Sequence, residues 1–156
     1  MRTGAPVFWC LAALVLAPTI AAGQDAVAVP LAERARGAER IVVGTVAAVG
    51  PVWRVNEFGD RLIVSVLRVT VNETLKGAVQ PTVDVEVEGG TIGEVTLRVS
   101  DQVSFTPGER AVFYLKRNPR GAFVPHLRGQ GLLKLDRSNR VQDSNLTLDS
   151  IRQASR

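Results

Sequence analysis

The segment from Thr82 to Glu88, which reads TVDVEVE, constrains the fold of this chain more than any other, because its polar and apolar residues alternate strictly. A period of two residues is characteristic of a β-strand with one buried face and one face in water. We therefore expect Val83, Val85 and Val87 to face a hydrophobic core, with the intervening carboxylates on the opposite side of the strand.

Other runs rich in β-branched residues continue this pattern along the chain, each bounded by glycine, proline or asparagine. They cover residues 41–49, 61–71, 94–99, 111–116, 122–125 and 132–135. The first run is apolar on both faces, as a central or barrel strand would be, and Gly44 within it indicates a bulge or a sharp bend. Six or seven strands joined by short turns predict a barrel or a sandwich.

The segments between these runs are rich in turn residues. We expect residues 50–60 to form a loop, residues 72–77 a turn, and residues 89–93 a mobile loop. Pro107 and Gly108 fit the two central positions of a type II turn.

Two short helices are predicted outside the strand-rich region. Residues 30–40 read as a brief helix, since Pro30 is tolerated at a first helical position. A second helix could begin at Thr147, with Asp149 in its first turn, although the few apolar residues that follow make it marginal. The predicted fold class is all-β with minor α content.

The amino terminus has the pattern of a secretory signal peptide. Arg2 precedes an uninterrupted apolar run, residues 7–17, and small residues follow at 21–23. An uncleaved membrane anchor is the alternative, but the run is shorter than the roughly 20 apolar residues that a span requires. We therefore expect a signal peptide at 1–23, a secreted or periplasmic location, no membrane span after cleavage, and one mature domain at 24–156.

The counts of cysteine and histidine exclude several kinds of catalytic site. Cys10 is the single cysteine and lies within the predicted signal, so the mature domain has no disulfide, thiolate nucleophile or cysteine–zinc site. His126 is the single histidine, which excludes a site with several histidines, and a lone histidine is most often a surface or cap residue. We expect no catalytic residue, metal or cofactor. A hydrolase with an unrecognised site is the alternative.

The acidic side of the alternating strand has two interpretations. Asp84, Glu86 and Glu88 could bind a cation or act as an acid–base pair, but a hard cation needs oxygen ligands that converge from several directions. A flat row favours a solvated or ion-paired face, with Arg98 or Arg68 as possible cross-strand partners.

Residues 110–140 contain the strongest concentration of charge, with eight basic residues against one acidic residue. Barrels of the OB type use basic faces with nearby aromatic residues to hold oligonucleotides or sugars. Export disfavours nucleic acid, which leaves anionic glycans, lipid head groups or an acidic protein as partners. The alternative is a basic surface that serves solubility. The candidate binding residues in this segment are Arg117, Arg120, Arg128 and Lys134.

Two aromatic residues in the predicted loop 50–60 are further candidates. Trp53 and Phe58 could anchor a protein partner, as aromatic hot spots often do, or they could cap the end of the barrel.

Three stretches carry a family resemblance: residues 38–46 (AERIVVGTV), 69–77 (VTVNETLKG) and 105–115 (FTPGERAVFYL). Their order resembles the OB-fold barrels of netrin modules and tissue inhibitors of metalloproteinases, and more closely that of uncharacterised secreted bacterial domains of this type. The resemblance covers about residues 38–135 and implies a five- to seven-stranded OB-like barrel with a short N-terminal and a marginal C-terminal helix.

The inhibitory mechanism of those relatives does not carry over with the fold. The inhibitors place a Cys-x-Cys at the mature amino terminus to reach a protease zinc, whereas the mature chain here begins near Gln24 without cysteine. We expect an exported, non-enzymatic binding or interaction module, whose partner is an unknown protein or an anionic polymer.

Overall fold

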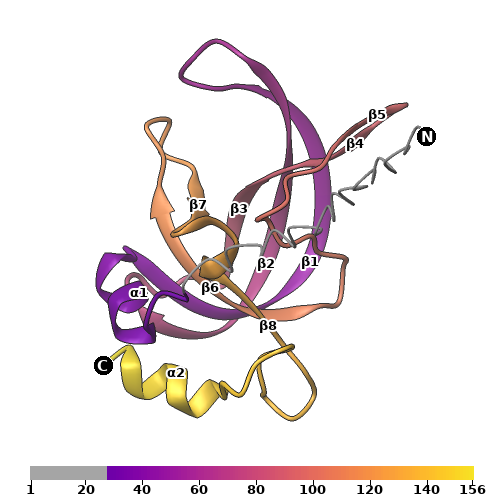
Figure 1. Cartoon of the computed structure of the whole chain (residues 1–156). Helices are drawn as coiled ribbons and strands as arrows, with labels where there is room; N and C mark the ends of the chain where they lie inside the picture. The colour runs from indigo at the N-terminus through magenta and orange to yellow at the C-terminus, as the bar shows by residue number, and fades with distance from the viewer. Residues whose placement is uncertain (1–27) are drawn as a thin grey trace, which may run out of the picture.

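The computed structural model describes residues 28–156, which form a mostly β structure with a short helix near each end (Figure 1). The predicted signal segment 1–23, with Cys10, lies outside the described residues. The strands are β1 Arg40–Val55, β2 Arg61–Lys76, β3 Thr82–Glu88, β4 Gly90–Ile92, β5 Val95–Leu97, β6 Arg110–Arg117, β7 Phe123–Pro125 and β8 Leu132–Leu135. The helices are α1 Leu31–Gly37, α2 Leu148–Ala154 and the 3₁₀ turn η1 Arg128–Gly131. The predicted class, mostly β with two short helices, is confirmed.

Five of the strands pair around a ring. β1 pairs antiparallel with β2 and with β6, β2 pairs with β3, and β6 pairs with β7. β3 and β7 close the ring in parallel orientation, but a single residue pair, Val85 with Phe123, joins them. We call this junction the seam. β8 adds a sixth strand by pairing with the first half of β6.

The ring encloses one hydrophobic core and carries a second on its outer side. Successive side chains of β1 and β6 point to opposite faces of the sheet. Val42 and Phe113 are buried in the inner core, while Val43 and Tyr114 are buried in the outer core. The helices cover the outer core, in which Ile151 of α2 is fully buried. Figure 1 places both helices at the end of the molecule opposite the tip of the β1–β2 hairpin. The fully buried segments of β1 and β6 therefore lie at the helix-covered end.

Two local predictions about the strands are confirmed. In β3 the valines at 83, 85 and 87 are buried in the inner core, and the acidic side chains lie on the other face. In β1 the pairing register shifts between Val43 and Gly44. A Cβ atom at Gly44 would lie 2.4 Å from Cγ1 of Val69 and 2.8 Å from the carbonyl oxygen of Thr70, so β2 passes too close for any side chain.

The predicted loop 50–60 is wrong over most of its length. β1 continues through Pro51 to Val55 and stays paired with β2, so the loop shrinks to residues 56–60. Pro51 is tolerated because the pairing of β1 with β6 ends at Thr45. Beyond that point no strand pairs with the β6 side of β1, so a proline there removes no backbone hydrogen bond to β6.

The predicted turn 72–77 is also wrong, because β2 stays paired with β1 through Lys76. The chain reverses only after Gly77, whose φ of +89° lies in the left-handed region that glycine adopts without strain. The Pro107–Gly108 turn is present, and Gly108 has the positive φ, +92°, that a type II turn requires at its third residue.

Residues 89–93 are not a simple loop. β4 and β5 pair with each other through three residue pairs and form a separate two-stranded sheet. Gly89 and Gly90 connect this ribbon to β3 with φ values of +109° and +138°, a conformation that favours glycine. The paired glycines therefore mark the start of a ribbon that leaves the ring.

Helix α1 is capped at its carboxyl end by Lys76. The Nζ of Lys76 donates to the carbonyl oxygens of Ala35, Arg36 and Ala38 at 2.8, 3.3 and 2.6 Å. These carbonyls have no partner within a short helix, and a cation is favourable at a helix carboxyl end. The Leu-Lys-Gly sequence at the end of β2 thus has a structural role.

Helix α2 begins where the sequence predicts, directly after Thr147. The Thr147 hydroxyl accepts from the amide of Ser150, and the Ser150 hydroxyl accepts from the amide of Thr147, which completes a capping box. Leu148 and Ile151 are buried in the outer core. Packing of these two side chains stabilises a helix that would be marginal alone.

Candidate functional site

A cavity of about 680 Å³ opens beside the seam, at the hairpin end of the molecule. We call it the seam cavity. Its walls come from the β1–β2 tip (residues 56–60), the end of β3, the β6–β7 turn (residues 118–122) and residues 124–128. A hollow forms here because β3 and β7 share a single residue pair, so the sheet does not continue between their ends.

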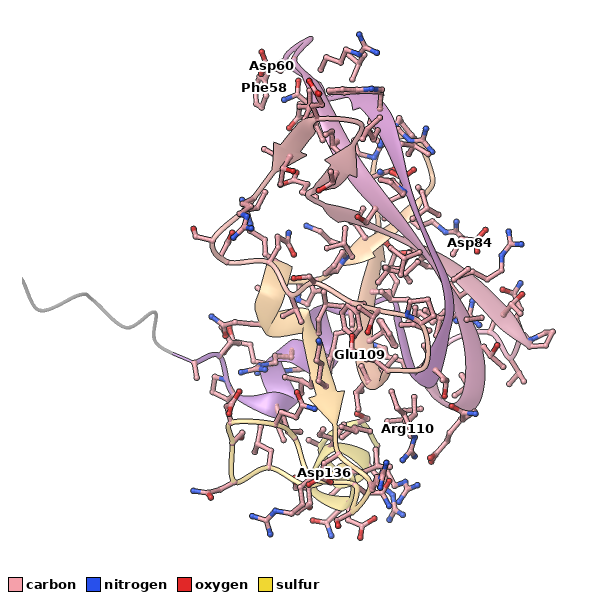
Figure 2. All side chains as sticks on the ribbon, turned by 90° about the vertical axis from the view of Figure 1, so that its right-hand side faces the viewer. Phe58, Asp60, Asp84, Glu109, Arg110 and Asp136 are labelled. Atoms are coloured by element: carbon pink, nitrogen blue, oxygen red, sulfur yellow. The ribbon has the colours of Figure 1, made fainter. Side chains whose placement is uncertain are left out.

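The tip of the β1–β2 hairpin forms one wall and is held by its own side chains. Oδ1 of Asn56 accepts from the amides of Phe58 and Asp60 at 3.0 and 2.8 Å. This side-chain turn leaves the ring of Phe58 81% exposed. Figure 2 shows Phe58 and Asp60 at the extreme end of the molecule. The tip therefore presents an aromatic side chain at the rim of the cavity without burying it.

Glu86 links the two sides of the seam. Its carboxylate accepts from Arg54 of β1 at 2.8 Å and from Arg120 of the β6–β7 turn at 2.7 Å. The Glu86 side chain is 11% exposed, so this ion pair network is shielded more than most surface pairs. Arg120 also donates to the carbonyl oxygen of Val55 at 3.0 Å. Side chains thus join the strands where backbone pairing stops.

Arg117 lies across the aromatic ring of Phe123. Its guanidinium carbon is 4.3 Å from the ring centroid, and its Nη1 donates to the carbonyl oxygen of Gly121 at 2.7 Å. The nearest carboxylate, that of Glu39, is 4.0 Å away. Arg117 is consequently positioned by an aromatic face and a carbonyl oxygen, with a weak carboxylate partner.

Arg128 lies in a strained segment of the wall. Leu127 and Arg128 have φ values of +60° and +53°, which cost residues other than glycine about 1–3 kcal/mol each. Arg128 pairs with Asp101 at 2.6 Å and with Glu88 at 3.4 Å. The two ion pairs hold the guanidinium at the mouth of the cavity.

Basic side chains outnumber acidic ones in the lining. Five basic and three acidic residues line the cavity: Arg54, Lys116, Arg117, Arg120, Arg128, Glu57, Glu86 and Glu88. The excess of two positive charges is much smaller than the local sequence suggests. The cavity therefore offers oriented guanidinium groups within a mixed-charge surface, and not a simple positive patch.

His126 also lines the cavity and is half-buried. Its Nδ1 has no hydrogen-bond partner within residues 28–156, and its ring packs against Gly37 at the end of α1. Burial lowers the pKa of His126, and the neighbouring charges of Lys116 and Lys76 lower the pKa further. The imidazole is therefore neutral at pH 7 and lies at the junction of the cavity with the helix-covered end.

The structure brings together four of the six predicted binding residues. Phe58, Arg117, Arg120 and Arg128 line the seam cavity, although Phe58 lies about 60 residues before the arginines in the sequence.

The other two predicted binding residues, Trp53 and Lys134, lie outside that lining. Trp53 belongs to β1, and the Arg61 guanidinium covers its ring at 4.4 Å. Lys134 pairs with Glu109 at 2.7 Å, and Figure 2 shows Glu109 well away from Phe58.

The acidic face of β3 is ion-paired, as the flat row predicts. Asp84 pairs with Arg68 on the neighbouring strand at 3.1 Å, which was one of the two expected partners. Glu86 and Glu88 pair with arginines of the seam cavity, and no pair with Arg98 forms within residues 28–156. Sequence reasoning missed Arg54, and it considered Glu86 only as one member of the acidic row of β3. Their pairing depends on the register of β1, β2 and β3, which the sequence alone does not fix.

Neither a metal-binding cluster nor a membrane-spanning helix is found in the part of the chain that the structure describes. Among residues 28–156, no group of three or more His, Cys, Asp or Glu side chains is arranged to hold a metal ion. Over the same residues, no helix is long and apolar enough to span a bilayer.

No protein-family model matches this chain, and no curated protein resembles it at a significant level. Function therefore rests on the geometry and charge of the seam cavity.

Proposed function

We propose that this protein is an exported, non-enzymatic binding module built on an OB-like barrel, and that its ligand is an anionic polymer bound in the seam cavity. Support for the barrel comes from the closed ring of pairings in the order β1-β2-β3-β7-β6, with β3 and β7 parallel. Support for export comes from the signal-like pattern at residues 1–23.

The position of the seam cavity supports a binding role. OB-type barrels bind their ligands on the face of the second and third strands and with the loops between strands one and two and between strands four and five. In this ring the corresponding loops are the β1–β2 tip and the β6–β7 turn, and the seam cavity lies between them.

The observation that carries the proposal is the convergence of Phe58 with Arg117, Arg120 and Arg128 on one cavity. An aromatic face next to guanidinium groups suits a polymer that has both ring surfaces and acidic groups.

The ion pairs already present leave donors for such a ligand. A guanidinium has five N–H donors, and Arg120 uses its two terminal nitrogens for Val55 and Glu86, so further N–H groups remain. Because intramolecular contacts already fix these side chains, binding sacrifices less rotamer freedom than on a free surface. A sulfate, phosphate or carboxylate of the ligand would accept from several arginines together.

The test is retention on an immobilised heparin-like polymer across a salt gradient. We expect the purified protein to elute above physiological salt, because contacts to anionic groups weaken steeply as salt increases. Arg117→Gln should elute clearly earlier. Arg68→Gln removes the same charge from the Asp84 pair, outside the seam cavity, and should elute close to the unmodified protein.

The result that contradicts the proposal is an equal shift of both variants, or no retention of the unmodified protein. Vesicles with anionic head groups, used in parallel, distinguish the two sources of acidic groups. Binding to the polymer and not to vesicles assigns a glycan-type ligand, whereas binding to vesicles alone contradicts the polymer ligand and points to a lipid surface.

A further inference from the structure

We propose that the protein has a second binding site, for a small uncharged amphiphile, in the mouth of the ring beneath the β4–β5 ribbon. Its cavity is distinct from the seam cavity, although Glu88 and Gln102 line both. It has a volume of about 730 Å³, which is within the usual range for small-molecule pockets, and barrel mouths are common places for such pockets.

The floor of this mouth cavity is the open end of the inner core. Leu67, Val87 and Phe105 line it and are among the buried residues of that core. Val49 and Val103 extend the apolar surface and are partly buried against the same core. An apolar group inserted here would contact side chains already held in place by the ring.

The rim of the mouth cavity is polar but carries no net charge. The uncharged polar side chains are Ser65, Thr91, Thr96, Ser100, Gln102 and Ser104. Glu88 and Arg98 are the charged residues of the lining, one of each sign, and Glu88 pairs with Arg128. A charged ligand would gain little here, whereas hydroxyl groups would find many partners.

Gln102 supplies an observation that points to a ligand with a donor. Its Oε1 is buried and has no hydrogen-bond partner among residues 28–156, although buried acceptors are normally paired. The side chain lies between the mouth cavity and the seam cavity and lines both, so a hydroxyl or N–H of a molecule in the mouth cavity would satisfy the oxygen once the amide group turns toward it. The ligand class is therefore an uncharged molecule with an apolar part and a hydroxyl-bearing head.

The β4–β5 ribbon lines one side of the mouth cavity without joining the main sheet. Its strands pair only with each other, and it joins β3 through Gly89 and Gly90, which adopt glycine-favoured conformations. The hydroxyl of Ser65 donates to the carbonyl oxygen of Gly89 at 2.7 Å and so holds the base of the ribbon. The amide of Gly89 also donates to the carbonyl oxygen of Ile63 at 2.9 Å, so the ribbon is anchored to β2 at its base, and beyond that point its strands pair only with each other.

The test is a titration of the purified protein with an octyl glucoside below its micelle concentration, followed by NMR of backbone and side-chain amides. We expect saturable shifts at the side-chain amide of Gln102, at Val87 and at Thr91. Glucose, which lacks the apolar chain, and octanoate, which carries a charge, should each bind at least tenfold more weakly.

A substitution of Gln102 tests whether its side-chain oxygen contacts the ligand. Gln102→Leu removes the unpaired acceptor and should weaken octyl glucoside binding by up to about tenfold, the loss expected for one hydrogen bond. Gln142→Leu makes the same change at an exposed position outside both cavities, so it is the matched control and should bind unchanged. Absence of shifts in the unmodified protein, or shifts centred on Phe58, would overturn the second site whatever the variant does. Equal binding of octanoate would overturn the assigned ligand class.

Discussion

The two ends of the β1–β2 hairpin differ in what covers them. At the helix-covered end, residues 40–44 of β1 are all buried, because the inner core lies on one side and the outer core on the other. At the tip end, none of residues 50–55 is buried, although the strand continues without a break. β1 is therefore enclosed on both faces at one end and only partly covered at the other, where Ile63 and Val64 of β2 stay buried but local opening of β1 is easier.

This contrast predicts that the largest loss of stability comes from the helix-covered end. Ile151→Ala should reduce the free energy of unfolding by about 2–5 kcal/mol, because Ile151 is fully buried in the outer core and its truncation leaves a cavity. Urea unfolding followed by circular dichroism measures the change. Val95→Ala, at an exposed position of β5, is the control and should change stability by less than about 0.5 kcal/mol. Similar losses in the two variants would contradict the division between the ends.

A smaller loss is expected from the cap of α1. Lys76→Met should reduce the free energy of unfolding by about 1.5–3 kcal/mol, because the carbonyl groups of Ala35 and Ala38 lose a charged donor. Arg36→Met removes an exposed positive charge from the same helix and serves as the control. If both variants unfold at the same urea concentration, the Lys76 contacts are not a significant part of the stability of that end.

The boundary between the two ends should respond to pH through His126. Its pKa is lowered in the folded state by burial and then by Lys116 and Lys76, so the unfolded chain binds the proton more readily. Stability should therefore fall as pH decreases below about 6.5, the ordinary value for histidine, and level off only below the folded-state pKa. His126→Asn should flatten this dependence between about pH 5 and 7, measured by urea unfolding at a series of pH values. A parallel slope in the variant would assign the effect to other groups.

How much the sequence predicts depends on whether a feature is local, because both ends contain a prediction that failed. The alternation in β3 fixes the inward valines, and the helix start at Thr147 follows from local capping chemistry. These features are local, so a short window of sequence contains the information. The ends of β1 and β2 were mispredicted because Pro51 and Asn72 are turn formers in isolation. Pairing between two long strands overrides that preference.

The candidate site was predicted only in part, for a related reason. The density of basic residues identifies Arg117, Arg120 and Arg128, since charge is visible in the sequence. Their meeting with Phe58, and the position of Glu86 between two arginines, require ring closure across the seam. A short window of neighbouring residues contains no information about these contacts between distant parts of the chain.

The smallest effect on stability is expected at the tip itself, where the effect on binding should be large. Phe58→Ala should change the free energy of unfolding by less than about 0.5 kcal/mol, because the ring is 81% exposed and its removal leaves no cavity. The same change should shorten retention on the heparin-like polymer, since Phe58 is the aromatic face at the rim of the seam cavity. Urea unfolding and the salt gradient, performed on one preparation, measure both quantities. A clear loss of stability would mean that the tip belongs to the folded core. Unchanged retention would mean that the ring of Phe58 does not contact the polymer and that the arginines alone hold it by charge.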